Sequence, residues 1–185
     1  MRSIILVCYL FVLFNMAYCG ITNVLLVHGA WQRAESWNRT VSYLLDKDIT
    51  YEIRAVDFPS KVIEWFSSGK TLPPTLEDYV TFLQQEIQNF NNKNGKLIVV
   101  AHSAGGIPAS LLIDSIKPNS RVLGMICFAC FLPKQGDNLI SIAAEDFERT
   151  LLLHPGTIVF NNDGTYGVNS SLIREIFYNN ATEQQ

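Results

Sequence analysis

Residues 97–106, which read LIVVAHSAGG, restrict the possible folds of this chain more than any other stretch. Four apolar residues, three of them β-branched, run into a corner of small residues that carries Ser103. An amphipathic segment, residues 107–116, follows directly. A buried strand, a sharp turn bearing a serine and then a helix is the arrangement of a nucleophile elbow.

Such a turn is tight, so the positions two before and two after the serine must be small. These positions hold Ala101 and Gly105, and Gly106 follows. The usual elbow pattern has glycine at the first position, but alanine has the next smallest side chain, so we expect the corner to close. The simpler alternative is that Ser103 only caps the helix that follows it.

Composition indicates an ordinary globular domain. Of the 185 residues, 48% are hydrophobic and 17% are charged. This composition is too apolar for a disordered chain, and the chain is long enough to bury a hydrophobic core of its own. The net charge is -3 and no basic patch stands out, so nucleic acid is not expected as a partner.

The first 19 residues have the pattern of a secretory signal peptide. Arg2 is the only charge before the apolar run 4–14, which is shorter than the roughly 20 residues of a membrane-spanning helix. Small residues at positions 17 and 19 fit a cleavage site before Gly20. We therefore expect a secreted mature chain without a membrane span, the alternative being an N-terminal buried strand.

Secretion would make three N-x-S/T sites relevant, and chance is their main competitor because the chain is rich in these residue types. The candidate glycosylation sites are Asn38, Asn169 and Asn180.

Removal of the signal peptide would leave two cysteines, Cys127 and Cys130. If both lie in one strand, a spacing of three directs them to opposite faces and prevents a bridge between them. The sequence favours thiols buried in the core over a C-x-x-C redox pair, which is expected at a helix start.

Strand and helix patterns alternate along the chain. Apolar runs predict strands at 23–28, 51–58, from Leu97 to the elbow, and at 121–132, with helices over 35–45 and 75–90 between them. This order predicts an α/β fold with a parallel sheet wrapped by helices on both faces. The corner at 28–31, Asp57 and Ser103 all follow strands, so we expect them at the carboxyl edge of the sheet, where function collects.

Residues 136–185 do not continue this alternation of strands and helices. We expect a helix over 137–153, a hairpin of 157–160 with 165–168 around the Asn-Asp-Gly turn at 162–164, and a short helix over 171–178. The predicted organisation is thus a signal peptide at 1–19, a core domain at 20–135 and a cap at 136–185.

Five segments, taken in order, resemble the α/β-hydrolase superfamily. The resemblance is strongest to the group of small esterases that includes plant methyl esterases of the salicylate-binding type, hydroxynitrile lyases and pyrethroid-type carboxylesterases. It extends over residues 23–180. The segments are LLVHGAW at 25–31, TLEDYV at 75–80, VVAHSAGG at 99–106, FACFLP at 128–133 and REIFYNN at 174–180.

The resemblance implies a serine hydrolase that acts on small carboxylic esters without a cofactor or metal. Ser103 would attack the ester carbonyl, and the backbone N–H groups of Ala30 and Ala104 would hold the resulting oxyanion. We interpret His28 and His102 as structural, Asp57 as the anchor of a turn, and the tryptophans Trp31 and Trp37 as packing residues.

The resemblance also implies an acid and then a histidine after the serine. His154 is the one histidine that follows Ser103, and it falls in the cap segment, where a catalytic histidine is not expected. The acids between the two are Asp114, Asp137, Glu145, Asp146 and Glu148. We therefore expect the acid and histidine of the triad to lie beyond Gln185, leaving an incomplete cap and an apolar edge on the fourth strand.

Three interpretations remain from the sequence. The first is an esterase-type hydrolase whose acid and histidine are missing from these residues. The second is an inactive truncated form or a small-ligand-binding member of the same fold. The third is a carbon–carbon lyase of the hydroxynitrile lyase type, which should carry a threonine near the oxyanion corner, where this chain has Ala30.

Overall fold

The computed structural model describes residues 20–46, 51–58, 74–137, 141–142, 154–160 and 166–178. The chain divides into two compact units, Met1–Leu132 and Pro133–Gln185. The predicted signal peptide and nearly all of the predicted helix at 137–153 lie outside the described residues. None of the helices in the described ranges has the length and apolar content that a membrane crossing requires.

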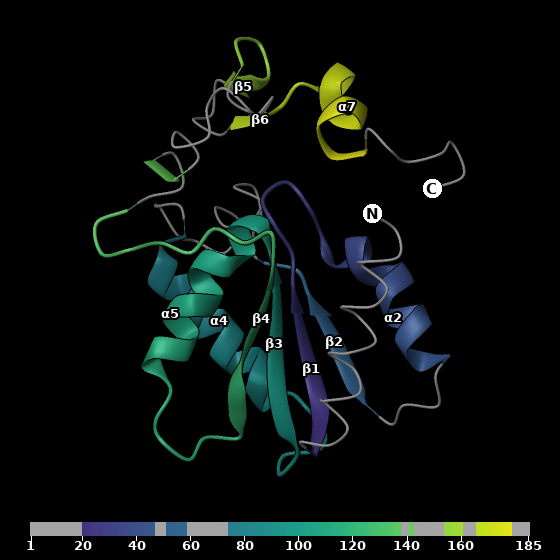
Figure 1. Cartoon of the computed structure of the whole chain (residues 1–185), viewed down its shortest axis with the longest axis vertical. Helices are drawn as coiled ribbons and strands as arrows, with labels where there is room; N and C mark the ends of the chain where they lie inside the picture. Colours follow the sequence, from purple (N-terminus) through teal and green to yellow (C-terminus); the bar gives the residue numbers. More distant parts are fainter. Residues whose placement is uncertain are drawn as a thin grey trace, which may run out of the picture. The chain divides into compact units, whose positions relative to one another are not determined.

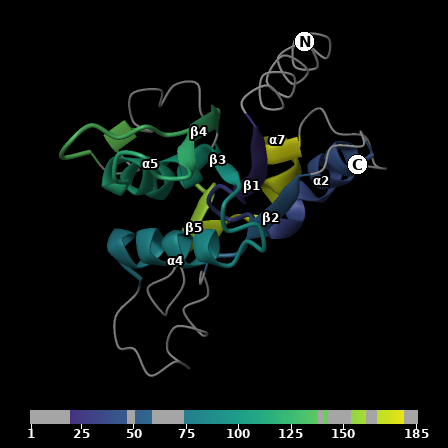
Figure 2. The ribbon, with the colours of Figure 1, turned by 90° about the horizontal axis from the view of Figure 1, so that it is seen from below.

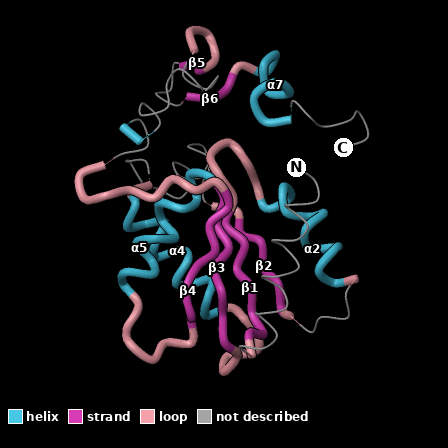
Figure 3. Tube along the Cα trace, viewed as in Figure 1, coloured by secondary structure: helices cyan, strands magenta, loops and turns pink. Residues whose placement is uncertain are grey.

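A four-stranded parallel sheet forms the centre of the first unit (Figures 1 and 3). Its strands are β1 (Ile21–Val27), β2 (Glu52–Val56), β3 (Lys96–His102) and β4 (Val122–Phe128), in the order β2-β1-β3-β4. The predicted α/β class and the parallel sheet are confirmed. Within the described sheet β4 is an edge strand, and Leu123 on it is 47% exposed, as expected for an apolar edge.

Helices cover both faces of this sheet, as Figure 2 shows in a view from below. One face carries α4 (Leu76–Gln88) and α5 (Gly106–Ser115), and the other carries the short 3-10 helix η1 (Ala34–Trp37) and α2 (Asn38–Leu45). The predicted helix at 35–45 is therefore two consecutive pieces of different geometry.

The inner strands alternate between the two covered faces. Leu25 and Val99 pack against α4 and α5, while Leu26 and Val100 belong to the cluster that includes Trp37. Because successive side chains of a strand point to opposite faces, a strand covered on both sides must be apolar throughout. This requirement explains why the strand segments read as continuous apolar runs.

Helix α4 begins where the sequence predicts, at a capping box. Thr75 Oγ1 accepts a hydrogen bond from Asp78 N–H at 3.3 Å, and Asp78 Oδ2 accepts one from Thr75 N–H at 2.9 Å. Each side chain thus satisfies a backbone donor that has no partner within the helix.

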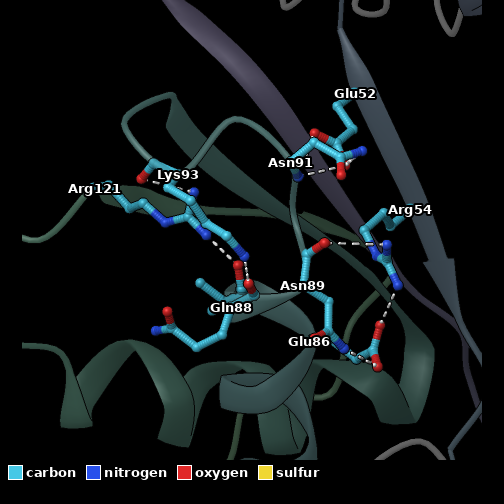
Figure 4. Close-up of polar contacts among 9 residues, drawn as sticks. Glu52, Arg54, Glu86, Gln88, Asn89, Asn91, Lys93 and Arg121 are labelled. Atoms are coloured by element: carbon cyan, nitrogen blue, oxygen red, sulfur yellow. Dashed lines mark hydrogen bonds and ion pairs between the residues drawn. The ribbon is translucent and has the colours of Figure 1, made fainter.

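Polar side chains hold the connection between α4 and β3 at the amino ends of the strands (Figure 4). Glu52 accepts hydrogen bonds from the backbone N–H groups of Asn91, at 2.9 Å, and Asn92, at 3.2 Å. Arg54 forms an ion pair with Glu86, with 3.1 Å between Nη2 and Oε2. This cluster joins β2 to the far end of α4.

Phe90 lies at the centre of the same connection and is fully buried. The guanidinium groups of Arg54 and Arg121 lie 5.7 and 5.9 Å from the centroid of its ring. Arg121 also donates to the carbonyl oxygens of Asn92, at 2.9 Å, and Lys93, at 3.1 Å. Cation–π contacts and hydrogen bonds therefore anchor the end of the sheet opposite the elbow.

The second unit contains the predicted hairpin. Strands β5 (Ile158–Phe160) and β6 (Tyr166–Val168) pair antiparallel, and the 3-10 helix η4 (Ser170–Leu172) leads into α7 (Ile173–Tyr178). Asn169 joins the two parts, because its Oδ1 accepts from Ser171 N–H and its Nδ2 donates to the Gly156 carbonyl. The residues of the predicted turn lie outside the described ranges.

The cysteine prediction is wrong for Cys127, which is exposed near the end of the edge strand β4. Cys130 is half-buried and lies beyond the strand, which ends at Phe128 and not at Leu132 as predicted. Ala129 between them has a φ of +44°, so the chain leaves the strand direction there. The two thiols therefore do not follow the alternation of a single strand.

We expect Glu52→Gln to destabilise the protein in a pH-dependent way. Burial opposes ionisation of Glu52, but the N–H groups of Asn91 and Asn92 and the charges of Arg54 and Lys93 outweigh it and lower the pKa of Glu52 below 4.5. A lowered pKa contributes stability that is present above about pH 4.5 and is lost as the pH falls through the folded-state pKa.

The measurement is thermal unfolding of wild type and variant between pH 7 and pH 3. The midpoint of Glu52→Gln should lie a few degrees lower at pH 7, and the gap should narrow in acid. Glu35→Gln, which removes an exposed carboxylate from η1, controls for the change in net charge. A gap that stays constant or widens toward pH 3 would contradict this role of Glu52.

Candidate active site

The chain turns sharply at Ser103, directly after β3. His102 ends the strand in an extended conformation, and Ser103 has a φ of +51°. Ser103 begins the 3-10 helix η2 (Ser103–Gly105), and α5 continues from it. A positive φ is unfavourable for a residue with a side chain, so surrounding contacts must hold it.

Close packing around the two glycines supplies those contacts. A Cβ on Gly105 would lie 2.4 Å from the His28 carbonyl oxygen, and one on Gly106 would lie 2.7 Å from Cys130 Cβ and from the Phe131 carbonyl oxygen. Ala101, two residues before the serine, is fully buried. Glycine is therefore required at 105 and 106, because neighbouring atoms leave no room for a Cβ.

The predicted oxyanion corner lies beside the elbow. Val27 at the end of β1 pairs in register with Ala101 of β3, so both strands end at the same edge. A Cβ built on Gly29 would lie 2.8 Å from Ser103 Cβ, which only glycine allows. The structure thus brings together two segments that are more than 70 residues apart in sequence.

Residues 29–32 form a turn that presents Ala30. The Gln32 N–H donates to the Gly29 carbonyl at 3.3 Å, and Trp31 at the third position has a φ of +57°. This turn hydrogen bond does not use the Ala30 N–H. Ala104, the second residue of η2, carries one of the N–H groups that have no acceptor within a helix.

Gln32 links the corner at 28–31 to the elbow through hydrogen bonds, a role that the sequence did not indicate. Its Oε1 accepts from Gly29 N–H at 3.1 Å and lies 2.9 Å from His102 Nδ1. Because an amide oxygen only accepts, His102 must carry its proton on Nδ1. Burial lowers the pKa of His102 below 6.5, which favours this neutral form at pH 7.

His28 and Asp57 contact the residues next to the corner. The buried His28 ring lies edge-on to Phe58, with 5.3 Å between centroids. Asp57 Oδ1 accepts from Ala34 N–H at 2.6 Å, and His28 Nε2 lies 3.9 Å from the same oxygen. Asp57 thus ties the segment after β2 to the start of η1. Trp37, predicted to pack, is 9% exposed, whereas Trp31 is 37% exposed.

A pocket of about 260 Å³ opens beside His102 on the α2 face. It provides a small space next to the elbow with both polar and aromatic walls. Its lining residues are Gln32, Ser36, Trp37, Thr40, His102 and Phe128.

A general base is not in place at Ser103 in the described part of the chain. No described side chain forms a hydrogen bond with Ser103 Oγ, and the ring of His102 is engaged by Gln32. His154 belongs to the second unit. Among the described residues, no three His, Cys, Asp or Glu side chains are grouped so that they could hold a metal ion.

The three glycosylation candidates differ in their exposure and hydrogen bonding. Asn38 is exposed at the first turn of α2, Asn169 uses both ends of its side chain in hydrogen bonds, and Asn180 lies outside the described residues. Modification of these residues stays a prediction.

Comparison with known proteins gives consistent matches. A family model described as "Alpha/beta hydrolase family" matches residues 24–178. Methylesterase 7 and Methylesterase 4 of Arabidopsis thaliana are 33% and 32% identical over 108 residues, which are 58% of this chain and 39% of each relative. The chain thus spans about two fifths of the length of these relatives.

Two solved structures share the fold. Polyneuridine aldehyde esterase superposes with a TM-score of 0.59 at 15% identity, covering 83% of this chain and 60% of that one. A mutant of tomato methylketone synthase I gives a TM-score of 0.57 at 15% identity, with 83% and 59% covered.

We expect Gly105→Ala to destabilise the protein by about 1–3 kcal/mol, because its Cβ would overlap the His28 carbonyl and force the two segments apart. Gly167→Ala is the matched control, since a Cβ there meets nothing within 4 Å. Denaturant unfolding of both variants measures the effect. Equal stabilities for the two variants would show that the elbow does not depend on this close approach.

Proposed function

Because the chain belongs to the alpha/beta hydrolase family, we propose that it is built for carboxylic ester hydrolysis with Ser103 as the nucleophile. The observation that carries this proposal is the left-handed conformation of Ser103, directly beside Gly29 of the oxyanion corner. A serine that only capped a helix would not require a positive φ or a glycine packed against its Cβ. Two methylesterases among the relatives favour a small ester as the substrate class.

The mechanism follows from the groups around Ser103. Its hydroxyl oxygen attacks the ester carbonyl and forms a tetrahedral intermediate with a negatively charged oxygen. The N–H groups of Ala30 and Ala104 donate to this oxyanion, and the positive end of the α5 dipole adds to the field. The alcohol then leaves, and water hydrolyses the acyl-enzyme.

Removal of the proton from Ser103 requires a base, normally a histidine oriented by a carboxylate. The 185 residues match only about two fifths of the methylesterase relatives, and we propose that the acid and the histidine lie in sequence outside them. The 185-residue chain alone should therefore be a poor catalyst.

The two other interpretations differ from this one in chemistry. A hydroxynitrile lyase would be expected to have a threonine at the corner, so Ala30 favours hydrolysis. A binding protein would hold the ester or acid without turnover, and the observation that separates it from an esterase is covalent modification of Ser103.

The first test is labelling by a fluorophosphonate probe in the longest chain that the reading frame encodes. Wild type should be labelled on Ser103, and Ser103→Ala should lose labelling and at least about 10³-fold of its esterase rate. Ser110→Ala is the matched control, because the Ser110 hydroxyl donates to the Ile107 carbonyl within α5. A folded chain that is not labelled would contradict the hydrolase proposal.

A companion experiment uses the 185-residue chain itself, which should hydrolyse short-chain aryl or methyl esters little above background. Rapid hydrolysis that Ser103→Ala abolishes would show that the base lies within these residues. His154→Ala would then identify it.

The oxyanion hole has a separate test in Ala30→Pro. Proline lacks the N–H but is favoured at the second position of this kind of turn, so the corner should keep its shape. In a chain with the complete triad, kcat should fall by about 10²–10³-fold, whereas Ala30→Gly, which keeps the N–H, should stay near wild type. An unchanged kcat in a folded Ala30→Pro variant would exclude the Ala30 N–H as an oxyanion donor.

A further inference from the structure

Two cysteines at the end of β4 lie outside the machinery described above. Cys127 is exposed on the strand, and Cys130 is half-buried three residues later. The positive φ of Ala129, +44°, turns the chain between them. This turn removes the geometric reason for the two thiols to point apart.

Ala101 of β3 shows how close the two residues are. Cys127 is its register partner across the sheet, and the Cys130 thiol donates to its carbonyl oxygen at 3.1 Å. Neighbouring strands are about 4.8 Å apart, so both cysteines lie around one residue. Burial first, and then the neighbouring Cys127 side chain, raise the pKa of Cys130 to about 12.

The segment that carries Cys130 also packs against the elbow. Gly106 lies so close that an added Cβ would be 2.7 Å from Cys130 Cβ and 3.0 Å from its sulfur. The Phe131 N–H donates to the Ser103 carbonyl at 3.0 Å. The thiol pair is therefore a direct neighbour of the turn at Ser103.

We propose that Cys127 and Cys130 are a thiol–disulfide pair, which a small-molecule disulfide such as glutathione disulfide oxidises to an intramolecular bond beside the elbow. The two thiols differ in solvent exposure, so that one can react first with the oxidant and the other can follow. Cys127 is exposed and accessible to the oxidant, whereas Cys130 is half-buried beside the same residue, Ala101.

The reaction proceeds by two exchanges. The Cys127 thiolate attacks one sulfur of glutathione disulfide, forms a mixed disulfide and releases one glutathione thiolate. Cys130 then loses its proton and attacks the Cys127 sulfur, which forms the protein disulfide and releases the second glutathione. Two protein thiols are oxidised and one glutathione disulfide is reduced to two thiols. The oxidised form no longer has the thiol hydrogen bond to Ala101.

The sequence allows a direct test of this pair. Trypsin cleaves after Arg121 and Lys134 and at no site between them, so Cys127 and Cys130 fall together in the peptide 122–134 and no other cysteine does. The folded 185-residue chain, in which Cys127 is exposed, is incubated with glutathione disulfide, its free thiols are alkylated, and the peptide mass is measured. We expect the wild-type peptide to be two hydrogens lighter than the reduced form and to carry no alkyl group.

Two single variants separate the roles. Cys130→Ser should accumulate one glutathione on Cys127, because the second exchange cannot occur. Cys127→Ser should stay unmodified at Cys130 in the folded protein. Because burial and the neighbouring Cys127 raise the pKa of Cys130, formation of the wild-type disulfide should also accelerate as the pH is raised from 7 to 9.

Three results would overturn the proposal. These are a wild-type peptide that keeps both thiols, one that stops at the mixed disulfide, and one that forms the bond only after denaturation. The readout is a peptide mass and does not depend on esterase activity, so failure of this proposal is distinct from failure of the proposed function.

Discussion

Parallel pairing of β1 with β3 is the interaction on which the rest of the candidate site depends. Val27 and Ala101 lie opposite each other at the ends of these strands, so the chain leaves the sheet twice at the same edge. One exit forms the corner at Gly29 and the other forms the turn at Ser103. Their separation is so small that Gly29 and Gly105 have no room for a side chain. Close packing, together with the hydrogen bond from the Phe131 N–H to the Ser103 carbonyl, therefore holds the serine in its left-handed conformation.

Polar groups then refine this arrangement. Gln32 bridges the Gly29 N–H and the His102 ring, and Asp57 holds the first N–H of η1. At the other end of the sheet, the contacts of Glu52, Arg54 and Arg121 hold the connection that leads into β3. The elbow strand is thus fixed at both ends, which suits a position where a reactive group must be presented with little freedom.

Local patterns predicted most of the first unit correctly, because each pattern had a local physical cause. The capping box of Thr75 and Asp78 begins α4, and apolar runs mark strands that are buried on both faces. Prediction failed at Cys127 and Cys130, where the apolar run 121–132 read as one strand. A positive φ at Ala129 ends the strand early, and no residue type at that position announces it, since alanine rarely adopts this conformation. Gln32 was also missed, because its partners are a neighbouring turn and a ring 70 residues away.

The sequence by itself determined the fold class and the sites of the two turns, since strand periodicity and small residues at fixed spacing leave few ways to build the chain. The family came from the resemblance of five segments to the α/β-hydrolase superfamily. It also named Ser103, Ala30 and Ala104 as candidates. Only the tertiary structure decided how close the corner and the elbow lie, which tautomer His102 adopts, and that two cysteines of an apolar run meet at Ala101. These properties depend on strand register and on single backbone dihedral angles, and neither is encoded in a local pattern of residue types.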